Sequence, residues 1–212
     1  MQTAGYDFEN SPKNFKDLER IAFMDFDAIA GKLKTKWPEI DAPKVEAGDR
    51  FVVIPTAQTF EILKYLRDDP DLYFDSLMNL AGADSGRELW VVYPLHSFKH
   101  LHKIMVKVVL PRENPEVESV VRLWGMADFF EREAYDLYGI IFKNHPDLRR
   151  IINPPDWVGW PGRKDYEFPP DYHGISTHRD DQFFADEVEQ GITAREEEEK
   201  VLLQKLGLAE KK

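Results

Sequence analysis

The sequence feature that most constrains the fold is the segment Met126–Tyr138, whose apolar residues surround most of a helix. The segment contains no proline and is followed by Gly139, a residue typical of helix C-termini. With about 100° of rotation per residue, its apolar side chains cover about 240° of the circumference. A surface helix that packs on one side needs an apolar arc of little more than about 100°. We therefore expect a helix that is covered on most sides, in part by another protein.

Two carboxylates fall inside the apolar part of this helix, at Glu131 and Glu133. The remaining polar stripe consists of Asp128, Arg132 and Asp136, at spacings of i, i+4 and i+8. An ionised carboxylate without a partner in apolar surroundings is costly, so each should pair with a cation or change its protonation state. The pattern therefore predicts that basic side chains bind Glu131 and Glu133.

The chain that follows the helix supplies these basic side chains. Six prolines lie between Pro146 and Pro170, interspersed with aromatic residues. Disordered linkers are poor in aromatics, so we expect an ordered, extended arm with arginines suited to bidentate carboxylate contacts. Trp157 and Trp160 fit either a contact within the chain or an interface anchor. The candidate interface residues are Glu131, Arg132, Glu133, Asp136, His145, Asp147, Arg149, Arg150, Trp157, Trp160, Arg163, Lys164 and Asp165.

The rest of the pattern predicts an α+β fold with two layers, in which helices pack on one face of a mostly antiparallel or mixed sheet. Apolar spacing and proline boundaries indicate the helices, and short apolar or alternating runs indicate the strands. The expected elements, in chain order, are a helix from Ser11 and Pro12 to Trp37, a strand at Phe51–Ile54, a helix from Thr56 to Pro70, strands at Tyr73–Ala81, Leu89–Leu95 and His102–Leu110, and a short helix from Asn114-Pro115 to Val121.

Three regions are expected along the chain: an α+β core domain at 1–142, the extended arm at 143–192, and a C-terminal helix and tail at 193–212. A capping box at Thr193 and Glu196 favours the terminal helix. The stretch 180–199 holds nine acidic residues and one arginine. Within it, Glu196–Glu199 fits a solvated helix face or, alternatively, an electrostatic contact with a basic neighbour.

Charge and composition exclude several classes of function. The formal net charge of −11 argues against a nucleic-acid-binding protein, which needs Lys and Arg to neutralise phosphates. The absence of cysteine excludes disulfides and any iron–sulfur or zinc site built on thiolates. We expect no transmembrane segment and no secretory or transit peptide, because no apolar run is long enough and the first residues are polar.

One long run of residues resembles a known family. Leu123–Ile140 reads LWGMADFFEREAYDLYGI and is followed by His145–Ile151, HPDLRRI, and by Gly159–Asp165, GWPGRKD. Together with Phe74–Leu77 and Val91–Ser97, these segments resemble the C subunit, or 30-kDa subunit, of respiratory complex I, the proton-translocating NADH:quinone oxidoreductase.

The resemblance implies a structural role without catalysis. Members of that family hold no FMN, iron–sulfur cluster or quinone, which belong to partner subunits. They pack on the quinone-site D subunit and near iron–sulfur subunits of the hydrophilic arm, on the cytoplasmic side of the bacterial membrane. Their contact with the membrane is therefore indirect, through the complex that transfers electrons from NADH to quinone.

Other interpretations remain open at this point. An equivalent subunit of an energy-converting hydrogenase or another relative of complex I has a similar sequence. A free-standing enzyme is a further alternative, although Glu131 and Glu133 project about 200° apart and cannot flank one substrate. His96, His100 and His102 are candidates for a metal site, but no nearby acid is present to orient them. His145 is a candidate general base, although a hydrogen-bonding loop role fits it better.

Overall fold

The computed structural model describes residues 23–44 and 48–177 of the chain. The described residues up to Tyr166 form one compact unit, and those from Glu167 onward form a second. The domain boundary expected at residue 142 stays a prediction. No helix in these described ranges is both long and apolar enough to cross a bilayer.

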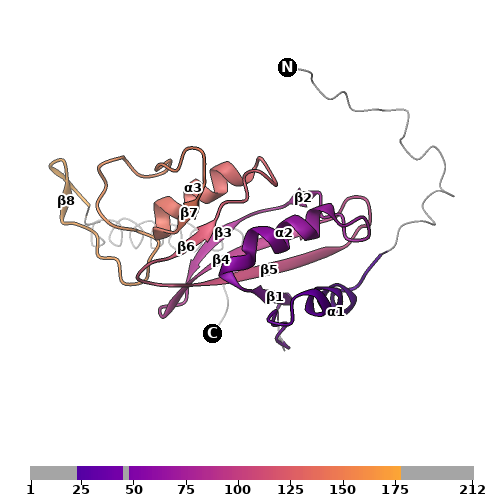
Figure 1. Cartoon of the computed structure of the whole chain (residues 1–212). Coiled ribbons are helices and arrows are strands. Elements are labelled where there is room, and N and C mark those ends of the chain that lie inside the picture. The colour runs from indigo at the N-terminus through magenta and orange to yellow at the C-terminus, as the bar shows by residue number, and fades with distance from the viewer. Residues whose placement is uncertain (1–22, 45–47, 178–212) are drawn as a thin grey trace, which may run out of the picture. The chain divides into compact units, whose positions relative to one another are not determined.

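A five-stranded mixed sheet forms the centre of the first unit (Figure 1). β1 (Phe51–Ile54) pairs in parallel with β5 (Lys103–Pro111), which pairs antiparallel with β4 (Glu88–His96). On its other side, β4 pairs antiparallel with both β2 (Ser76–Leu77) and β3 (Ala81–Asp84). The predicted mixed, mostly antiparallel sheet is therefore confirmed.

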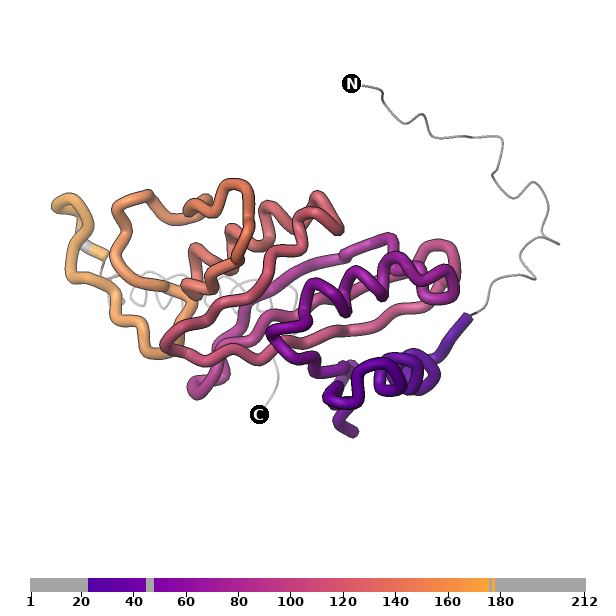
Figure 2. Tube along the Cα trace, viewed as in Figure 1, coloured from indigo at the N-terminus to yellow at the C-terminus, as the bar shows by residue number. Residues whose placement is uncertain are grey.

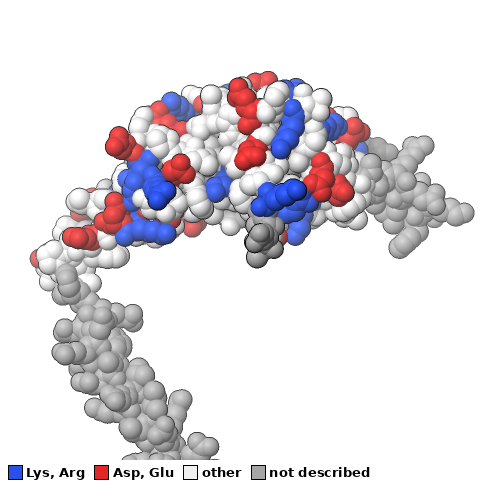
Figure 3. Space-filling model, turned by 90° about the horizontal axis from the view of Figure 1, so that it is seen from below, with Lys and Arg blue, Asp and Glu red and all other residues white. Residues whose placement is uncertain are grey.

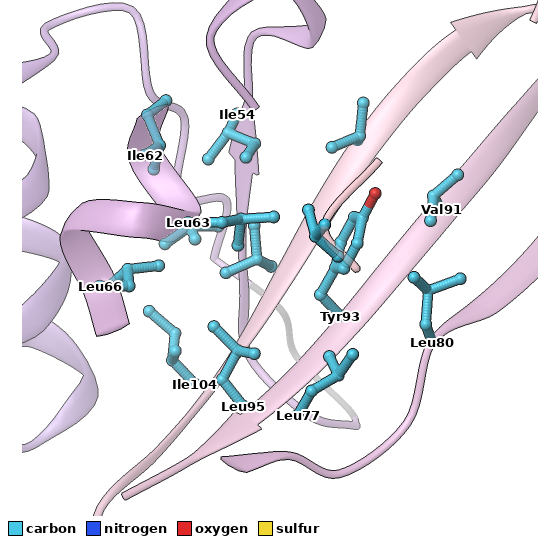
Figure 4. Packing of buried hydrophobic residues seen from close by; sticks show 14 of the residues in the cluster. Ile54, Ile62, Leu63, Leu66, Leu77, Leu80, Val91, Tyr93, Leu95 and Ile104 are labelled. Atoms are coloured by element: carbon cyan, nitrogen blue, oxygen red, sulfur yellow. The ribbon is translucent and has the colours of Figure 1, made fainter. Parts of the chain in front are cut away.

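Alternating side chains give β4 and β5 one buried face and one half-buried face, as expected for period-2 patterning. Helix α2 (Thr59–Asp68), which follows a short 3-10 turn η3 (Thr56–Gln58), covers the buried face. Figure 4 shows Leu63 and Leu66 extending from α2 toward the strands. Burying each such side chain contributes about 1.5–3 kcal/mol, so this layer holds the other elements in place.

Helix α1 (Phe26–Lys36) begins later than the sequence suggests. Asp25 caps it, because its carboxylate accepts a hydrogen bond of 2.8 Å from the backbone N–H of Ala28. The predicted helix start at Ser11 and Pro12 lies outside the described residues, and the described part before Phe26 is not helical.

Helix α3 (Ala127–Tyr138) lies on the same face of the sheet as α2. Gly82 of β3 pairs with Val91 of β4, whose side chain belongs to the buried core. A Cβ at Gly82 would lie 2.7 Å from the ring of Tyr138, so the missing side chain lets α3 approach the strand. The expected packing of helices on one face of the sheet is confirmed.

The strand predicted at Tyr73–Ala81 is wrong in its first half. Tyr73 has a positive φ of 41°, and the backbone N–H of Phe74 donates to the carbonyl of Leu66 at 3.0 Å. These residues complete the end of α2 instead of forming a ladder. Within Tyr73–Ala81, only the two residues of β2 and Ala81, the first residue of β3, pair with another described strand.

The short helix predicted after Asn114-Pro115 is also wrong. β6 (Glu116–Glu118) pairs in parallel with β7 (Ile141–Lys143) and buries Val117. The valine spacing fits either structure, but β-branched residues favour a strand once a partner strand is available. The partner strand β7 follows α3 in the sequence, so the residues around β6 do not reveal it.

The second unit contains a small hairpin of β8 (Asp171–Tyr172) and β9 (Ile175–Ser176). His173 and Gly174 connect the strands, and both have positive φ, as two-residue hairpin turns with right-handed twist require. The predicted terminal helix at 193–212 and the whole acidic stretch at 180–199 lie outside the described residues.

Candidate interface at the end of helix α3

Most of the polar stripe of α3 is buried, and part of the helix's apolar surface is exposed. Glu131, Arg132 and Asp136 are at most 5% exposed, whereas Met126 and Phe129 are 61% and 63% exposed. The chain after β7 turns back along α3 (Figure 2), and we call its residues 145–166 the covering segment. This segment packs against the side of the helix that the sequence pattern assigns to solvent.

Asp136 holds the covering segment by its carboxylate. Oδ2 accepts backbone hydrogen bonds from Ile151, Ile152 and Asn153 at 2.9, 2.7 and 2.9 Å. Oδ1 accepts from the guanidinium of Arg150 at 2.7 Å and from the amide of Asn153 at 2.9 Å. Burial raises the pKa of Asp136, but the donors from Asn153, Arg150 and the backbone outweigh it and lower the pKa to about 2.

Arg150 joins the helix to two parts of the covering segment. It donates to the side chain of Asp136 and, at 2.9 Å, to the same residue's carbonyl, while its other terminal nitrogen donates to the carbonyl of Gly159 at 2.7 Å. Its guanidinium lies over the ring of Trp160, 4.5 Å from the ring centroid. Trp160 in turn contacts Tyr135 of α3 edge to face.

The helix ends at Gly139, where a close contact with Trp160 requires glycine. Gly139 adopts a φ of 72°, the left-handed conformation of a helix C-terminal cap. A Cβ at this position would lie 2.5 Å from the indole of Trp160. Trp160 therefore forms a contact within the chain, one of the two roles that the sequence left open.

The last carbonyl groups of α3 also bind the covering segment. The backbone N–H of Gly162 donates to the carbonyl of Leu137 at 2.8 Å, and Arg163 donates from Nε to that of Tyr138 at 2.8 Å. These carbonyls have no partner within the helix, and the negative end of the helix dipole favours a guanidinium. The contact thus satisfies the end of the helix completely.

A second carboxylate, Asp84 at the end of β3, fixes the far end of the covering segment. It accepts from Arg112 at 2.5 Å, from the backbone N–H of Lys164 at 2.8 Å and from that of Gly86 at 2.7 Å. Arg112 also binds Asp165. Burial raises the pKa of Asp84, but Arg112 and the backbone donors outweigh it and lower the pKa to about 2.

Glu131 is buried and has no arginine partner among residues 23–44 and 48–177, so the predicted Glu131–arginine pair is wrong there. Its Oε1 accepts from the backbone N–H of Val120 at 2.7 Å, and its Oε2 lies 3.9 Å from Nε2 of His145. Burial raises the pKa of Glu131 to about 7, against opposing hydrogen bonds from Ser119 and Val120. The arginines expected here bind Asp136 and the helix end instead.

The expected burial of Glu133 is wrong as well. Its side chain is exposed, and no arginine contacts it within the described ranges. Arg149 pairs with Asp147 at 2.8 Å, and both side chains are more than half exposed. Arg132 is buried and donates to the carbonyl of Arg149 at 3.4 Å. The side chain of Trp157 is half-buried, and its expected interface role stays a prediction.

Sequence reasoning missed Asp84, Arg112 and Asn153. Asn153 lies three residues after Arg150 in the chain, and its side-chain amide is a hydrogen-bond donor that could have been considered as a partner for a buried carboxylate. Lys164, by contrast, is separated from Asp84 by 80 positions, and no local pattern connects them.

Two of the three histidines considered as metal ligands, His100 and His102, make hydrogen bonds to backbone carbonyls. His100 Nε2 lies 2.9 Å from the carbonyl of Pro70, and His102 Nε2 lies 2.6 Å from that of Leu72. Among the described residues, no group of three or more potential ligands could hold a metal ion. His145, considered as a base, lies 3.2 Å from the carbonyl of Asp128.

The surface outside the covering segment offers a separate hollow of about 450 Å³. Its lining includes Phe26, Arg50, Met78 and Met105, none of which belongs to α3 or the covering segment. On the face in Figure 3, basic and acidic side chains lie side by side, so neither sign of charge dominates it.

A family model described as "Respiratory-chain NADH dehydrogenase, 30 Kd subunit" matches residues 52–172, which include the sheet, α3 and the covering segment. The C subunit of NADH-quinone oxidoreductase from Chloroherpeton thalassium is 49% identical over 113 residues, which cover 52% of this chain and 47% of the relative. The chain thus matches about half the length of that relative. The C subunit of the same enzyme from Acidothermus cellulolyticus is 38% identical over 168 residues, covering 74% of this chain and 88% of the relative.

A third relative has a different name. The C subunit of the F(420)H(2) dehydrogenase from Methanosarcina mazei is 41% identical over 152 residues, covering 69% of this chain and 95% of the relative. Among solved structures, a trypsin-resistant fragment (1–134) of Nqo5 matches with a TM-score of 0.51 and 29% identity, over 59% of this chain and all of the fragment. A chain of an archaeal membrane-bound sulfane sulfur reductase, at 20% identity and a TM-score of 0.54, shares the fold over 66% of this chain and 85% of its own length.

Proposed function

Because the chain belongs to the respiratory-chain NADH dehydrogenase 30 Kd subunit family, we propose that it is a structural, non-catalytic subunit of a membrane-associated oxidoreductase complex. In this proposal it docks on the quinone-site D subunit and neighbouring iron–sulfur subunits in the peripheral arm of NADH:quinone oxidoreductase. Partner subunits hold FMN, the iron–sulfur clusters and quinone. The complex places the chain on the cytoplasmic side of the bacterial membrane.

The use of the buried charges supports a structural role. The carboxylates of Asp136 and Asp84 are occupied by donors from the chain itself. The guanidinium groups of Arg150 and Arg163 bind helix carbonyls. Groups with these partners position the backbone, and removing one partner of a buried ion pair typically costs about 3–5 kcal/mol.

The observation that carries the docking proposal is an exposed apolar ridge beside these contacts. Met126, Phe129 and Glu133 lie at i, i+3 and i+7 of α3, so they share one helix face. Met126 and Phe129 are each more than 60% exposed, and Ile152, beside Asp136, is 57% exposed. We call these four residues the docking ridge. A rigidly held apolar surface with one carboxylate suits a partner with apolar side chains and a basic residue opposite Glu133.

Phe129→Ser tests the ridge, and Phe98→Ser is the matched control. Phe98 lies in the turn after β4, is 67% exposed and does not belong to the docking ridge. Exposure makes both substitutions nearly neutral for folding of the chain. Each variant replaces the native chain in its host, and blue-native electrophoresis with in-gel NADH oxidation measures assembled complex and turnover per complex.

We expect Phe129→Ser to reduce the assembled complex at least fivefold, because loss of an anchor residue costs at least about 1–2 kcal/mol of binding free energy. Turnover per assembled complex should be unchanged, and Phe98→Ser should assemble normally. Full assembly with a collapsed turnover number in Phe129→Ser would contradict a purely structural role.

F(420)H(2) is a second candidate for the electron donor. The relative from Methanosarcina mazei is named for it, and this chain covers 95% of that relative. The same architecture therefore fits a relative of complex I with another donor. Affinity purification of the tagged native complex from solubilised membranes separates the two. Co-purified flavin and NADH oxidation support the NADH enzyme, whereas F(420)H(2) oxidation without NADH oxidation supports the alternative.

A further inference from the structure

Glu131 is a fully buried carboxyl group that the docking proposal does not use. It lies in the middle of α3, is 0% exposed, and Oε1 accepts a hydrogen bond of 2.7 Å from Val120. Oε2 is equally inaccessible and has no hydrogen-bond partner within the described ranges. A charged oxygen in that position would lack compensation.

The basic group that faces Oε2 is His145. The backbone N–H of Asp147 donates to Nδ1 of His145 at 3.0 Å, so this nitrogen acts as an acceptor. Nε2 lies 3.3 Å from Oδ1 of Asp128 and 3.9 Å from Oε2 of Glu131. Nε2 is thus too far from Oε2 to donate a hydrogen bond to it.

The hydroxyl of Ser119 favours a negative charge on Glu131, but burial outweighs it and two neighbouring carboxylates oppose the charge. Asp128 faces it from α3 and Glu118 from β6, and both carboxylates disfavour ionisation of Glu131. From β4, the buried hydroxyl of Tyr93 interacts with Glu131. Arg132, the next residue, is directed elsewhere, toward the carbonyl of Arg149 and the ring of Phe129.

We propose that Glu131 is a buried proton-binding site: it is held as a neutral carboxylic acid, and its ionisation weakens the packing of α3 against β6 and residues 145–147. The proton occupies Oε2, while Oε1 continues to accept from Val120. The site makes the stability of this chain depend on pH in the neutral range, independently of any partner.

The sign of the pH dependence follows from the raised pKa. The usual pKa of a glutamate is 4.5, and burial raises that of Glu131 to about 7. Between these two values the folded chain binds one more proton than the unfolded chain. The stabilisation is therefore complete below pH 4.5 and is lost as the pH rises through about 7.

Glu131→Gln tests the site, because an amide has the same shape and cannot ionise. Glu133→Gln, an exposed carboxylate two residues away on the same helix, is the matched control. Urea unfolding of the full-length chain is measured from pH 5 to pH 8 for all three proteins. Relative to Glu131→Gln, the unfolding constant of the wild type should rise about fiftyfold over this range. Glu133→Gln should follow the wild type.

A ratio between wild type and Glu131→Gln that stays constant with pH would overturn the proposal, since it would mean an unshifted carboxyl group. A second measurement does not depend on the variant's ability to fold. The ¹³C shift of the Glu131 carboxyl carbon in the wild-type chain should titrate near pH 7, and ¹⁵N shifts should show an unprotonated Nδ1 on His145. Titration near pH 4.5, or a protonated Nδ1 at pH 7, would also overturn it.

Discussion

Arg150 binds Asp136 twice with a single nitrogen, at 2.7 Å from the carboxylate and at 2.9 Å from the backbone carbonyl. One guanidinium therefore fixes both a side chain and the last turn of α3. Its other terminal nitrogen binds the carbonyl of Gly159, which extends the same contact to the next part of the covering segment.

Asp136→Asn should destabilise the chain strongly. The amide offers one acceptor oxygen in place of two, and its NH₂ group faces N–H donors from residues 151–153. We expect a loss of about 3 kcal/mol in the free energy of unfolding at pH 7, measured by urea titration. Asp147→Asn removes an exposed pair with Arg149 and should change the midpoint little. Equal effects of the two substitutions would contradict the role given to Asp136.

The stability of the chain in acid should depend on the same carboxylate. The pKa of Asp136 falls from 3.8 to about 2 on folding, so the unfolded chain binds more protons in this range. Its contribution of about 2 kcal/mol is present above pH 4 and is lost as the pH falls toward 2. The difference in unfolding free energy between wild type and Asp136→Asn should shrink accordingly from pH 6 to pH 2. A difference that stays the same at pH 2 would show that Asp136 is not ionised in the folded chain.

Gly139→Ala should destabilise the chain, and Gly31→Ala should stabilise it. At Gly139, alanine must adopt a left-handed conformation that costs about 1–2 kcal/mol, and its Cβ would overlap the Trp160 ring. Gly31 lies inside α1 with open space around it, so alanine should add about 0.5–1 kcal/mol. Thermal unfolding of both variants measures the opposite shifts. A neutral Gly139→Ala would mean that Trp160 moves away without cost.

The sequence predicted α3 and its end well, because helical periodicity and a terminal glycine are local signals. It also predicted the strand alternation of β5 and the position of helices on one face of the sheet. The sequence did not predict correctly which charged side chains pair with each other in the candidate interface. The stripe of Asp128, Arg132 and Asp136 resembles a solvent-exposed charge ladder, and only the path of the covering segment shows that most of it is buried.

The remaining errors have a common physical cause, which is that the deciding partner is distant in the chain. β6 forms because β7 returns beside it after α3, and the helical spacing of Val117, Val120 and Val121 does not exclude a strand at Val117. Glu131 is surrounded by groups from β4, β6 and the residues after β7, so an expected ion pair became a neutral acid. Glu133, which was expected to be buried, projects from the opposite side of the helix.

The hydrogen bond between Lys164 and Asp84 has a consequence for biogenesis. Synthesis proceeds from the N-terminus, so the β3–β4 hairpin leaves the ribosome long before its donor 80 residues later is made. Closing so long a loop is entropically slow compared with forming the hairpin. A nascent chain that ends before Arg150 thus leaves the final turn of α3 uncovered, whereas Asp84 already has Arg112 as a partner and gains its last backbone donor only when Lys164 is made.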